Sequence, residues 1–434
     1  MHLLMLMIIY YINSYYNFLI KKWISDNMKA DAYKIVDNVY WVGVLDWDIR
    51  DYHGYTLNGT TYNCYLVFGE DKVALIDNVY PGKSEQFWGR IKDAFEKEGR
   101  EFKIDVVIQN HIENDHSGSL GEVVAKFPDV EVYCSKKAEP GLKNHLPELA
   151  DFEFNTVKTG DSLDIGGKTF QFVNAPILHW PDSMFTMLME DGILFSNDAF
   201  GQHICLSERL DTDVDPVILT EAARKYYANL ITLASPMVGR KIEELAKLGL
   251  VEILKMIAPC HGQIFTNPEF IIDLYTKWST GTYEGNKITF IYDTMHHSTQ
   301  RMAHAMAEGV MSEGVEVKMY FMHDDDKSDA VTDVLDSKAI FVGAPTMMNN
   351  PFPGIGDVMY YLNCLSFGNI ETKKAVVFGS KGWAGGSARV LAANLEGAGF
   401  EVVEQMEIDF KPTEEQLEEC YELGKKVAQM IKEE

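Results

Sequence analysis

The chain has 434 residues, which is too long for one ordinary hydrophobic core and predicts two domains. Its hydrophobic fraction of 46% and aromatic fraction of 12% are those of a globular protein and argue against a disordered one. The formal net charge of -26 argues against a nucleic-acid binder, because no basic stretch is concentrated enough to neutralise phosphates.

The cysteines indicate a reducing compartment. They are spaced singly along the chain without any C-x-x-C pair, at positions 64, 134, 205, 260, 364 and 420. This spacing argues against a disulfide framework, an internal rubredoxin, a zinc ribbon and an iron–sulfur cluster. We therefore expect a cytoplasmic protein.

Residues 1–27 differ in composition from the rest of the chain. They run apolar from Leu3 to Ile20 and end in a pair of lysines and a polar stretch. A signal peptide has its positive charge before the apolar stretch and a small-residue cleavage site after it, and neither is present. We favour an upstream start that adds a non-native leader before Met28. An interfacial or membrane anchor and a docked helix are the alternatives.

Deletion of residues 1–27 is therefore expected to leave a soluble protein with full activity. The change in composition at Met28 motivates this expectation. Fractionation and activity assays of the full-length and shortened chains test it. Recovery of the full-length chain in membranes, with the shortened chain in the supernatant, would support an anchor instead.

The segment 28–280 is predicted to form one domain. Short apolar runs between turn signals predict strands at 61–69, 72–77 and 169–176, and amphipathic periodicity predicts helices at 83–99 and 221–231. Because the strands come first in close succession, we expect mixed sheets layered with helices.

After a polar, glycine-containing linker at 277–286, the segment 286–434 is predicted to form a second domain. Five strand-like runs there alternate with helical stretches, at 287–293, 315–321, 338–345, 374–380 and 401–408. This alternation is typical of a doubly wound parallel sheet. An amphipathic helix at 413–431 closes the chain.

Four segments of the first domain carry a polar residue just past the end of a strand-like run. These residues are His111, His179, Asp198 and His261. Strand ends of this kind gather at one rim of a sheet, where loops form ligand sites. The stretch QNHIENDHSG at 109–118 adds Glu113, Asp115 and His116. One zinc ion takes three or four protein ligands, so seven candidate ligands predict two metal ions with a bridging carboxylate.

An ordinary capped helix is the alternative explanation of this stretch. Asp115 and Ser117 would then cap the segment GSLGEVVAKF, and the histidines would be polar loop residues. Four strand-end motifs together favour the metal site.

With NHIENDHSG, APILHWPDSMF, LFSNDAFG and APCHG, the chain resembles the flavodiiron proteins over roughly Met28 to Glu434. Hydrolases of the metallo-β-lactamase fold usually carry H-x-H-x-D-H, whereas this chain has Glu113 in place of the second histidine. Oxygen-rich ligation moves the preference from zinc towards iron. The resemblance implies a metallo-β-lactamase-like αββα sandwich followed by a flavodoxin-like doubly wound parallel sheet.

The resemblance also implies how the ligands divide between two iron ions. One ion would be bound by His111, Glu113 and His179, the other by Asp115, His116 and His261, with Asp198 bridging them. His116 is the least secure of these, because some family members displace the matching histidine by water. His53 and His203 are candidates for supporting or proton-donating groups near the metals.

The second domain carries candidate loops for FMN. Hydroxyl groups and backbone N–H groups at the start of the helix after its first strand form an anion cradle, and no G-x-G-x-x-G motif occurs there. In flavodoxin-like order the FMN phosphate lies at this position. The candidate FMN residues are Thr294, Met295, His297, Ser298, Thr299, Pro345, Thr346, Met347, Asn349, Ser380, Gly382, Trp383, Ala384 and Gly385. Trp383 is placed to stack on the flavin ring.

Two cofactors in series indicate electron transfer. The chain looks most like methanogen oxidases that pass electrons from the reduced 8-hydroxy-5-deazaflavin coenzyme through FMN to a di-iron site, where dioxygen is reduced to water. A rubredoxin-dependent dioxygen or nitric oxide reductase is the alternative, and a zinc hydrolase of the metallo-β-lactamase fold is a more remote one. The resemblance implies a homodimer or homotetramer with head-to-tail pairing.

Overall fold

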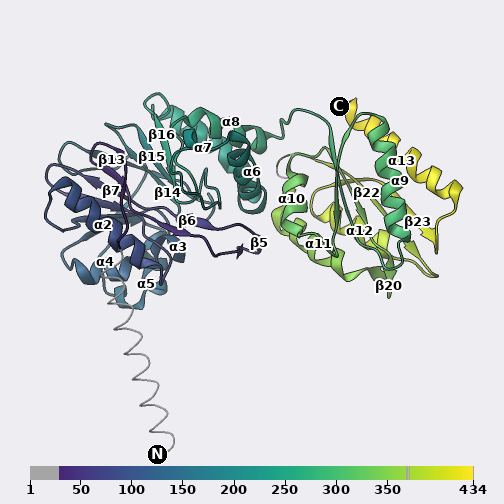
Figure 1. Cartoon of the computed structure of the whole chain (residues 1–434), viewed down its shortest axis with the longest axis horizontal. Helices are drawn as coiled ribbons and strands as arrows, with labels where there is room; N and C mark the ends of the chain where they lie inside the picture. Colours follow the sequence, from purple (N-terminus) through teal and green to yellow (C-terminus); the bar gives the residue numbers. More distant parts are fainter. Residues whose placement is uncertain (1–28, 368–369, 371, 434) are drawn as a thin grey trace, which may run out of the picture. The chain divides into compact units, whose positions relative to one another are not determined.

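The computed structural model of the chain describes residues 29–367, 370 and 372–433 (Figure 1). The leader 1–27 lies outside the described residues. The chain forms two compact units, and the first contains Asn58–Leu219, Leu245–Glu269 and the residues up to Ile49. The second contains Arg50–Leu57, Thr220–Glu244 and everything from Phe270 onward. The domain limits at 280 and 286 stay a prediction.

Two sheets form the framework of the first unit (Figure 1). The first sheet has the order β1 (Tyr33–Val36), β2 (Val39–Trp41), β7 (Tyr65–Phe68), β8 (Val73–Ile76), β9 (Val106–Gln109), β10 (Glu131–Ser135) and β11 (Asn155–Val157). The second has the order β12 (Ser162–Asp164), β13 (Thr169–Asn174), β14 (Met184–Leu188), β15 (Ile193–Asn197) and β16 (Met256–Pro259). Strands β8 to β11 are parallel, as are β15 and β16, so both sheets are mixed as predicted.

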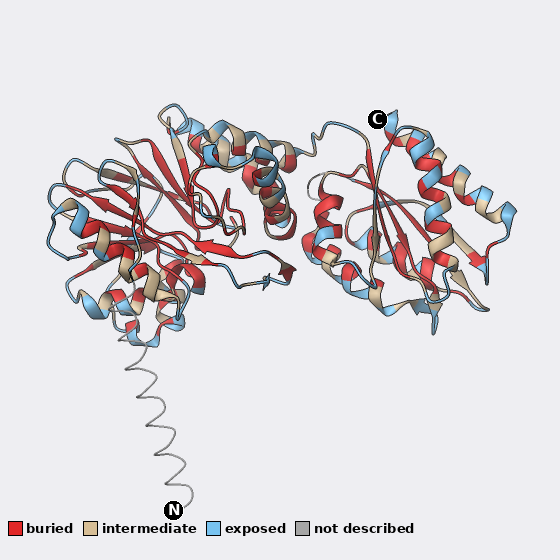
Figure 2. Ribbon diagram, viewed as in Figure 1, coloured by how far each residue is buried: buried red, intermediate tan, exposed pale blue. Residues whose placement is uncertain are grey.

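Helices complete the first unit. Apolar side chains of the first sheet pack against α2 (Ser84–Glu98), α4 (Leu120–Lys126) and α5 (Ala138–His145). A second core, which includes Trp41, Phe170 and Phe195, fills the space between the two sheets. Figure 2 shows the resulting buried strands. The remaining short elements are β3 (Val44–Asp46), β6 (Thr60–Tyr62), α3 (Asn114–Ser117), 3-10 turns at Pro147–Leu149 and Asp211–Asp213, and the start of α6 (Pro216–Tyr226).

Helix α2 shows how the sequence sets these elements. Its buried residues Phe87, Ile91, Ala94 and Phe95 recur at the spacing of one helix face, as the amphipathic pattern predicted. The helix ends at Gly99, whose φ of 61° is left-handed, a conformation that costs glycine little.

The second unit is built on a five-stranded parallel sheet. Its order is β18 (Glu316–Phe321), β17 (Lys287–Tyr292), β19 (Ala339–Gly343), β22 (Lys374–Lys381) and β23 (Glu401–Asp409), which is 2-1-3-4-5 in chain order. This is the flavodoxin-like order of a doubly wound sheet, so the predicted architecture is confirmed. Strands β17 and β19 are buried along their whole length, because helices cover both faces.

Helices α9 (Ser298–Ser312) and α13 (Glu414–Lys432) pack on one face of this sheet. Helices α10 (Lys327–Leu335), α11 (Pro353–Leu365) and α12 (Ser387–Gly397) lie on the other (Figure 1). The unit also contains the hairpins β4 (Asp51–Tyr52)–β5 (Tyr55–Thr56) and β20 (Thr346–Met347)–β21 (Asn350–Pro351), a π-helix at Tyr227–Ile231, a 3-10 turn at Thr232–Ala234, most of α7 (Ser235–Lys247) and most of α8 (Pro268–Thr280). The predicted linker is therefore shorter than 277–286, since its first four residues end α8.

No helix in the described part of the chain is long and apolar enough to cross a membrane. All six cysteines are free thiols, and only Cys364 is exposed among them.

Candidate metal centre and flavin site

The seven candidate metal ligands of the first unit lie together. His111 and Glu113 follow β9, and the short helix α3 places Asp115 and His116 one turn further on. The other three ligands follow the second sheet, His179 after β13, Asp198 after β15 and His261 after β16. Parallel strands that end at the same rim bring these segments together, although they are far apart in the sequence.

The first group of donors surrounds one oxygen of Asp198. His111 Nε2 lies 3.5 Å from Asp198 Oδ2 and 3.5 Å from Glu113 Oε2. His179 Nε2 lies 3.6 Å from Asp198 Oδ2 and 3.5 Å from Glu113 Oε2. Two imidazoles and two carboxylates therefore face one small volume.

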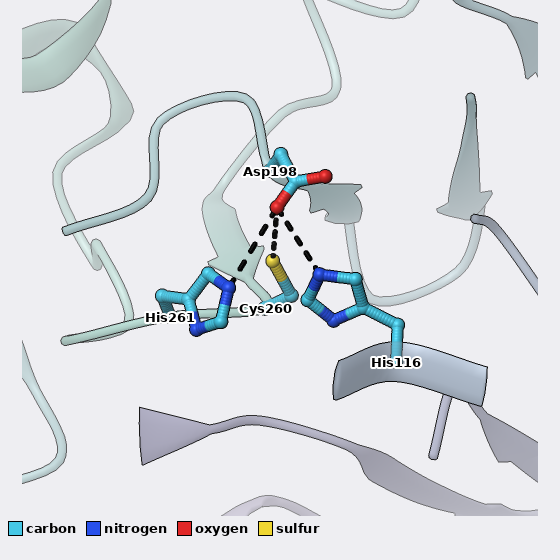
Figure 3. A group of neighbouring side chains, drawn as sticks. All are labelled: His116, Asp198, Cys260 and His261. Atoms are coloured by element: carbon cyan, nitrogen blue, oxygen red, sulfur yellow. Dashed lines mark hydrogen bonds and ion pairs between the residues drawn. The ribbon is translucent and has the colours of Figure 1, made fainter. Parts of the chain in front are cut away.

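The second group surrounds the other oxygen of the same carboxylate. His116 Nε2 lies 3.2 Å and His261 Nε2 3.7 Å from Asp198 Oδ1 (Figure 3). Asp115 reaches both rings, with Oδ1 3.3 Å from His116 Nε2 and Oδ2 3.2 Å from His261 Nε2. Asp198 therefore stands between the two groups with one oxygen towards each.

These separations fit metal coordination. Ligand atoms that share one ion at bonds of about 2.1 Å lie roughly 3.0–3.4 Å apart in octahedral or tetrahedral geometry. Several of the donor atoms are also buried without a hydrogen bond, namely His111 Nε2, both carboxylate oxygens of Asp115 and both ring nitrogens of His116. Buried polar atoms of this kind are costly unless a ligand binds them. The residues present thus fit a two-metal centre.

Neighbouring groups hold two of the histidines in place. His111 Nδ1 lies 2.8 Å from Asp182 Oδ2, and the same oxygen accepts a hydrogen bond from the Ile112 backbone N–H at 2.9 Å. His261 Nδ1 donates to the carbonyl of Thr61 at 2.6 Å. Each contact fixes the ring so that Nε2 faces the donor group, as is usual for metal-binding histidines.

The charges of these side chains suit the binding of metal cations. Burial lowers the pKa of His111, but its hydrogen bond to Asp182 and the nearby carboxylates raise it well above its usual value. Burial also lowers the pKa of His116, while Asp115 and Asp198 raise it to about 9. Burial raises the pKa of Asp198, but the imidazoles, His116 first, hold it well below its usual range. The cluster therefore attracts protons, and metal binding would replace them.

The capped-helix alternative is wrong. Asp115 and Ser117 lie inside α3, and Ser119 occupies the position before α4 without a capping hydrogen bond from its side chain. The hydroxyl of Ser117 instead donates to the Ile112 carbonyl at 2.7 Å, which stabilises the ligand loop.

The two candidate supporting histidines differ in position. His203 is only 8% exposed, its Nδ1 lies 2.7 Å from Thr60 Oγ1, and its ring centroid is 4.3 Å from that of His261. His53 is exposed in the β4–β5 turn of the second unit. Its role stays a prediction.

Sequence reasoning missed three groups of this centre. They are Asp182, Thr61 and Cys260, whose Sγ lies 3.2 Å from Asp198 Oδ1. The only sequence signals were the placement of Asp182 two residues past Trp180 in the His179 motif and of Cys260 directly before His261.

In the second unit, the candidate flavin residues lie at the carboxyl ends of β17, β19 and β22, in the connecting loops, in β20 and at the start of α9. The point between β17 and β19 is where the strand order reverses, the usual ligand position of such sheets. The loops also contact each other, because Thr299 Oγ1 lies 3.4 Å from Ser380 Oγ, and Thr346 Oγ1 accepts from the Ser387 N–H at 3.2 Å.

These loops fit FMN. Thr294 Oγ1 is buried without a hydrogen bond in the loop between β17 and α9, where a phosphate would accept one. Three large apolar candidates are solvent-exposed, Trp383 at 87%, Met295 at 42% and Met347 at 37%. His297, directly before α9, has a left-handed φ of 62°, a conformation that costs glycine little. An exposed tryptophan three residues after Ser380, whose hydroxyl lies 3.4 Å from that of Thr299, suits a planar, phosphorylated ring.

Both parts of the chain match known families. Residues 57–239 match the metallo-beta-lactamase superfamily, and residues 290–424 match flavodoxin. Over 403 residues the chain is 58% identical to the coenzyme F420H2 oxidase of Methanocaldococcus jannaschii, with 92% of this chain and 97% of the relative covered. It is 38% identical to the nitric oxide reductase of Moorella thermoacetica, with coverage of 92% and 98%.

Two solved structures are similar over nearly their whole length. The rubredoxin oxygen:oxidoreductase of Desulfovibrio gigas has a TM-score of 0.86 at 32% identity, covering 93% of this chain and 99% of that one. The flavodiiron protein of Giardia intestinalis has a TM-score of 0.86 at 31% identity, covering 93% and 97%. The chain belongs to the flavodiiron protein family, a class of oxidoreductases. The predicted family and the predicted combination of a metallo-β-lactamase domain with a flavodoxin domain are confirmed.

Replacement of Glu113 by histidine is expected to lower the iron-to-zinc ratio of the purified protein several-fold. The substitution exchanges an oxygen donor for a nitrogen donor and so favours the softer ion. Elemental analysis of the variant and the parent measures the ratio. Glu153→His, an exposed position of the first unit, is the control. Equal iron-to-zinc ratios in the Glu113 variant and the parent would contradict the role of Glu113 in the choice of metal.

Replacement of Trp383 by alanine is expected to weaken FMN binding without loss of metal. Stacking of an aromatic side chain on a flat ring contributes on the order of 1 kcal/mol, which is about fivefold in Kd. Flavin titration of the apoprotein measures the change. Tyr360→Ala, 73% exposed on α11, should bind FMN like the parent. Loss of iron together with flavin would contradict the separation of the two sites.

Proposed function

We propose that this protein is a flavodiiron oxidase that reduces dioxygen to water with electrons from reduced coenzyme F420, the 8-hydroxy-5-deazaflavin coenzyme, passed through FMN. The observation that carries the proposal is the pair of donor groups that share Asp198, one around each carboxylate oxygen. When bound there, two iron ions supply the Lewis acidity and the electrons that reduction of a small oxidant requires. An electron carrier without catalytic activity would not need this centre.

Different residues of the chain would bind the two iron ions. One iron would be held by His111, Glu113 and His179. The other would be held by Asp115, His116 and His261, and Asp198 would bind both ions. Six of the seven side chains are buried and His179 is partly exposed, so little bulk water reaches the oxidant. His203 Nδ1 lies 2.7 Å from Thr60 Oγ1, which lies 3.5 Å from His261 Nδ1, so His203 is a further imidazole next to the centre that can hold a proton at its Nδ1.

The 58% identity to an oxidase of reduced coenzyme F420 supports this coenzyme as the electron donor. The absence of any C-x-x-C pair supports a donor that is not an internal rubredoxin. The second candidate is a rubredoxin-dependent dioxygen or nitric oxide reductase, favoured by the more distant similarity to proteins with those activities. A zinc hydrolase has no use for the flavodoxin domain, and iron content and a flavin spectrum distinguish it.

Anaerobic reduction of the bound FMN tests the donor. The oxidised protein is mixed with reduced coenzyme F420 or with reduced rubredoxin, and bleaching of the flavin band is followed in time. Dioxygen or nitric oxide is then added to each reduced sample. We expect fast bleaching by the coenzyme and reoxidation by dioxygen. Bleaching by rubredoxin alone would establish the second candidate.

We also infer a homo-oligomer in which electrons cross between subunits. A domain of about 250 residues has a radius of gyration near ~18 Å, so cofactors in separate domains of one chain are tens of ångströms apart in most arrangements. Electron transfer over such a distance is slow. Head-to-tail pairing would place the flavin of one chain near the irons of another, in a homodimer or a homotetramer of such pairs.

A further inference from the structure

Cys260 lies inside the second donor group of the metal centre. Its thiol is 1% exposed and donates to Asp198 Oδ1 across 3.2 Å. Figure 3 shows the sulfur between the rings of His116 and His261, with all three side chains directed at the same Asp198 oxygen. Among the described residues, it is the one cysteine that belongs to a group of possible metal ligands.

The geometry permits the sulfur to bind the same ion as its neighbours. The ligand atoms of His116, Asp198, Cys260 and His261 all lie within 4.8 Å of one another. Around one ion, a sulfur at about 2.3 Å and a nitrogen at about 2.0–2.1 Å are roughly 3.5 Å apart in tetrahedral geometry. Modest closure of the group around an ion therefore brings all four atoms into bonding distance.

Two further features of this group favour the binding of a cation. His116 is fully buried, and its Nε2 has no hydrogen bond. The backbone of Cys260 is fixed on both sides, since its N–H donates to the Asn197 carbonyl at 3.0 Å and its carbonyl accepts from the Asn63 N–H at 2.7 Å. The thiol is thus held beside the imidazoles by the strand end itself.

We propose that the second metal position accepts a thiophilic divalent cation, zinc or cobalt, with Cys260 as a sulfur ligand beside His116, His261 and Asp198. On binding, the S–H bond of Cys260 breaks, a sulfur–metal bond forms, and the proton passes to solvent; no electron is transferred. Cys260 would join the Asp115, His116, His261 and Asp198 donors, and a sulfur beside two imidazoles moves the preference of this position towards zinc. Cys260 therefore determines which ions compete with iron at this position. This role does not depend on which electron donor reduces the flavin.

Zinc X-ray absorption of the full-length protein, with FMN bound, tests the assignment. The metals are removed with a chelator, and two zinc ions per chain are restored. We expect a Zn–S shell at about 2.3 Å, distinct from the Zn–N and Zn–O shells at about 2.0–2.1 Å, with one sulfur for every two zinc ions. Absence of the sulfur shell from the wild-type protein with both ions bound would by itself overturn the proposal.

Variants identify the sulfur. Cys260→Ser keeps a hydrogen-bond donor to Asp198 and nearly the same volume, and it should lose the Zn–S shell. Its zinc affinity should fall at least about tenfold, the lower end of what loss of a supporting group costs a metal site. Cys134→Ser, buried elsewhere in the first unit, and Cys364→Ser, exposed in the second, should keep the shell. A shell that persists in Cys260→Ser would refute the assignment.

Cobalt provides a second measurement. Anaerobic addition of Co²⁺ to the metal-free wild-type protein should produce a sulfur-to-cobalt charge-transfer band in the difference spectrum. The band should be missing in both Cys260→Ser and Cys260→Ala and present in the two control variants. A wild-type protein that binds cobalt without this band would contradict the proposal.

Discussion

Replacement of Asp198 by alanine is expected to remove both iron ions and to abolish dioxygen reduction. Its Oδ2 faces the first donor group and its Oδ1 the second, so one substitution takes a ligand from each ion. Loss of a group that only supports a metal ligand already costs roughly 10–100-fold in metal affinity. We therefore expect iron affinity to fall by at least about 100-fold and turnover to fall with iron content.

Iron analysis, flavin content and oxygen consumption measure this effect. FMN should remain bound, since its loops belong to the other unit. Asp198→Asn, which keeps one oxygen donor, should retain more iron than Asp198→Ala. Asp213→Ala, an exposed position of the first unit, should match the parent. An Asp198→Ala protein with the iron content of the parent would show that the carboxylate does not bridge two metals.

Mixing two inactive chains is expected to restore activity. One chain lacks the metals through Asp198→Ala, and the other has weakened FMN binding through Trp383→Ala together with Ser298→Ala. Each is inactive alone at limiting FMN, but a mixed pair contains one intact flavin facing one intact metal centre. With random assortment into pairs, about a quarter of the wild-type rate should return.

Oxygen consumption before and after subunit exchange measures the recovery, and size-exclusion chromatography checks that mixed oligomers have formed. Mixing each variant with itself is the control. Mixed oligomers without recovered activity would show that electrons stay within one chain. A fully active monomer at assay concentrations would contradict the inferred oligomer.

The sequence alone predicted most of the elements and the candidate metal ligands, although the predicted strand at 61–69 is two strands, β6 and β7, and the predicted helix at 221–231 begins at Pro216. Periodicity marked α2, because its one buried face leaves a repeat of apolar residues, and continuous apolar runs marked β17 and β19, because both of their faces are buried. The candidate metal ligands were also visible in the local sequence. A strand end followed by histidine or aspartate is a local signal, and His111, His179, Asp198 and His261 each carry it.

Only the tertiary structure decided what lies around those ligands. Asp182 orients His111 from 71 residues away, and the Thr61 carbonyl orients His261 from 200 residues away. Such contacts depend on which strands become neighbours, and no local pattern of apolar residues records that choice. The same reason hid Cys260, since a cysteine at a strand end looks like any buried core residue until the sheet brings His116 and Asp198 beside its sulfur.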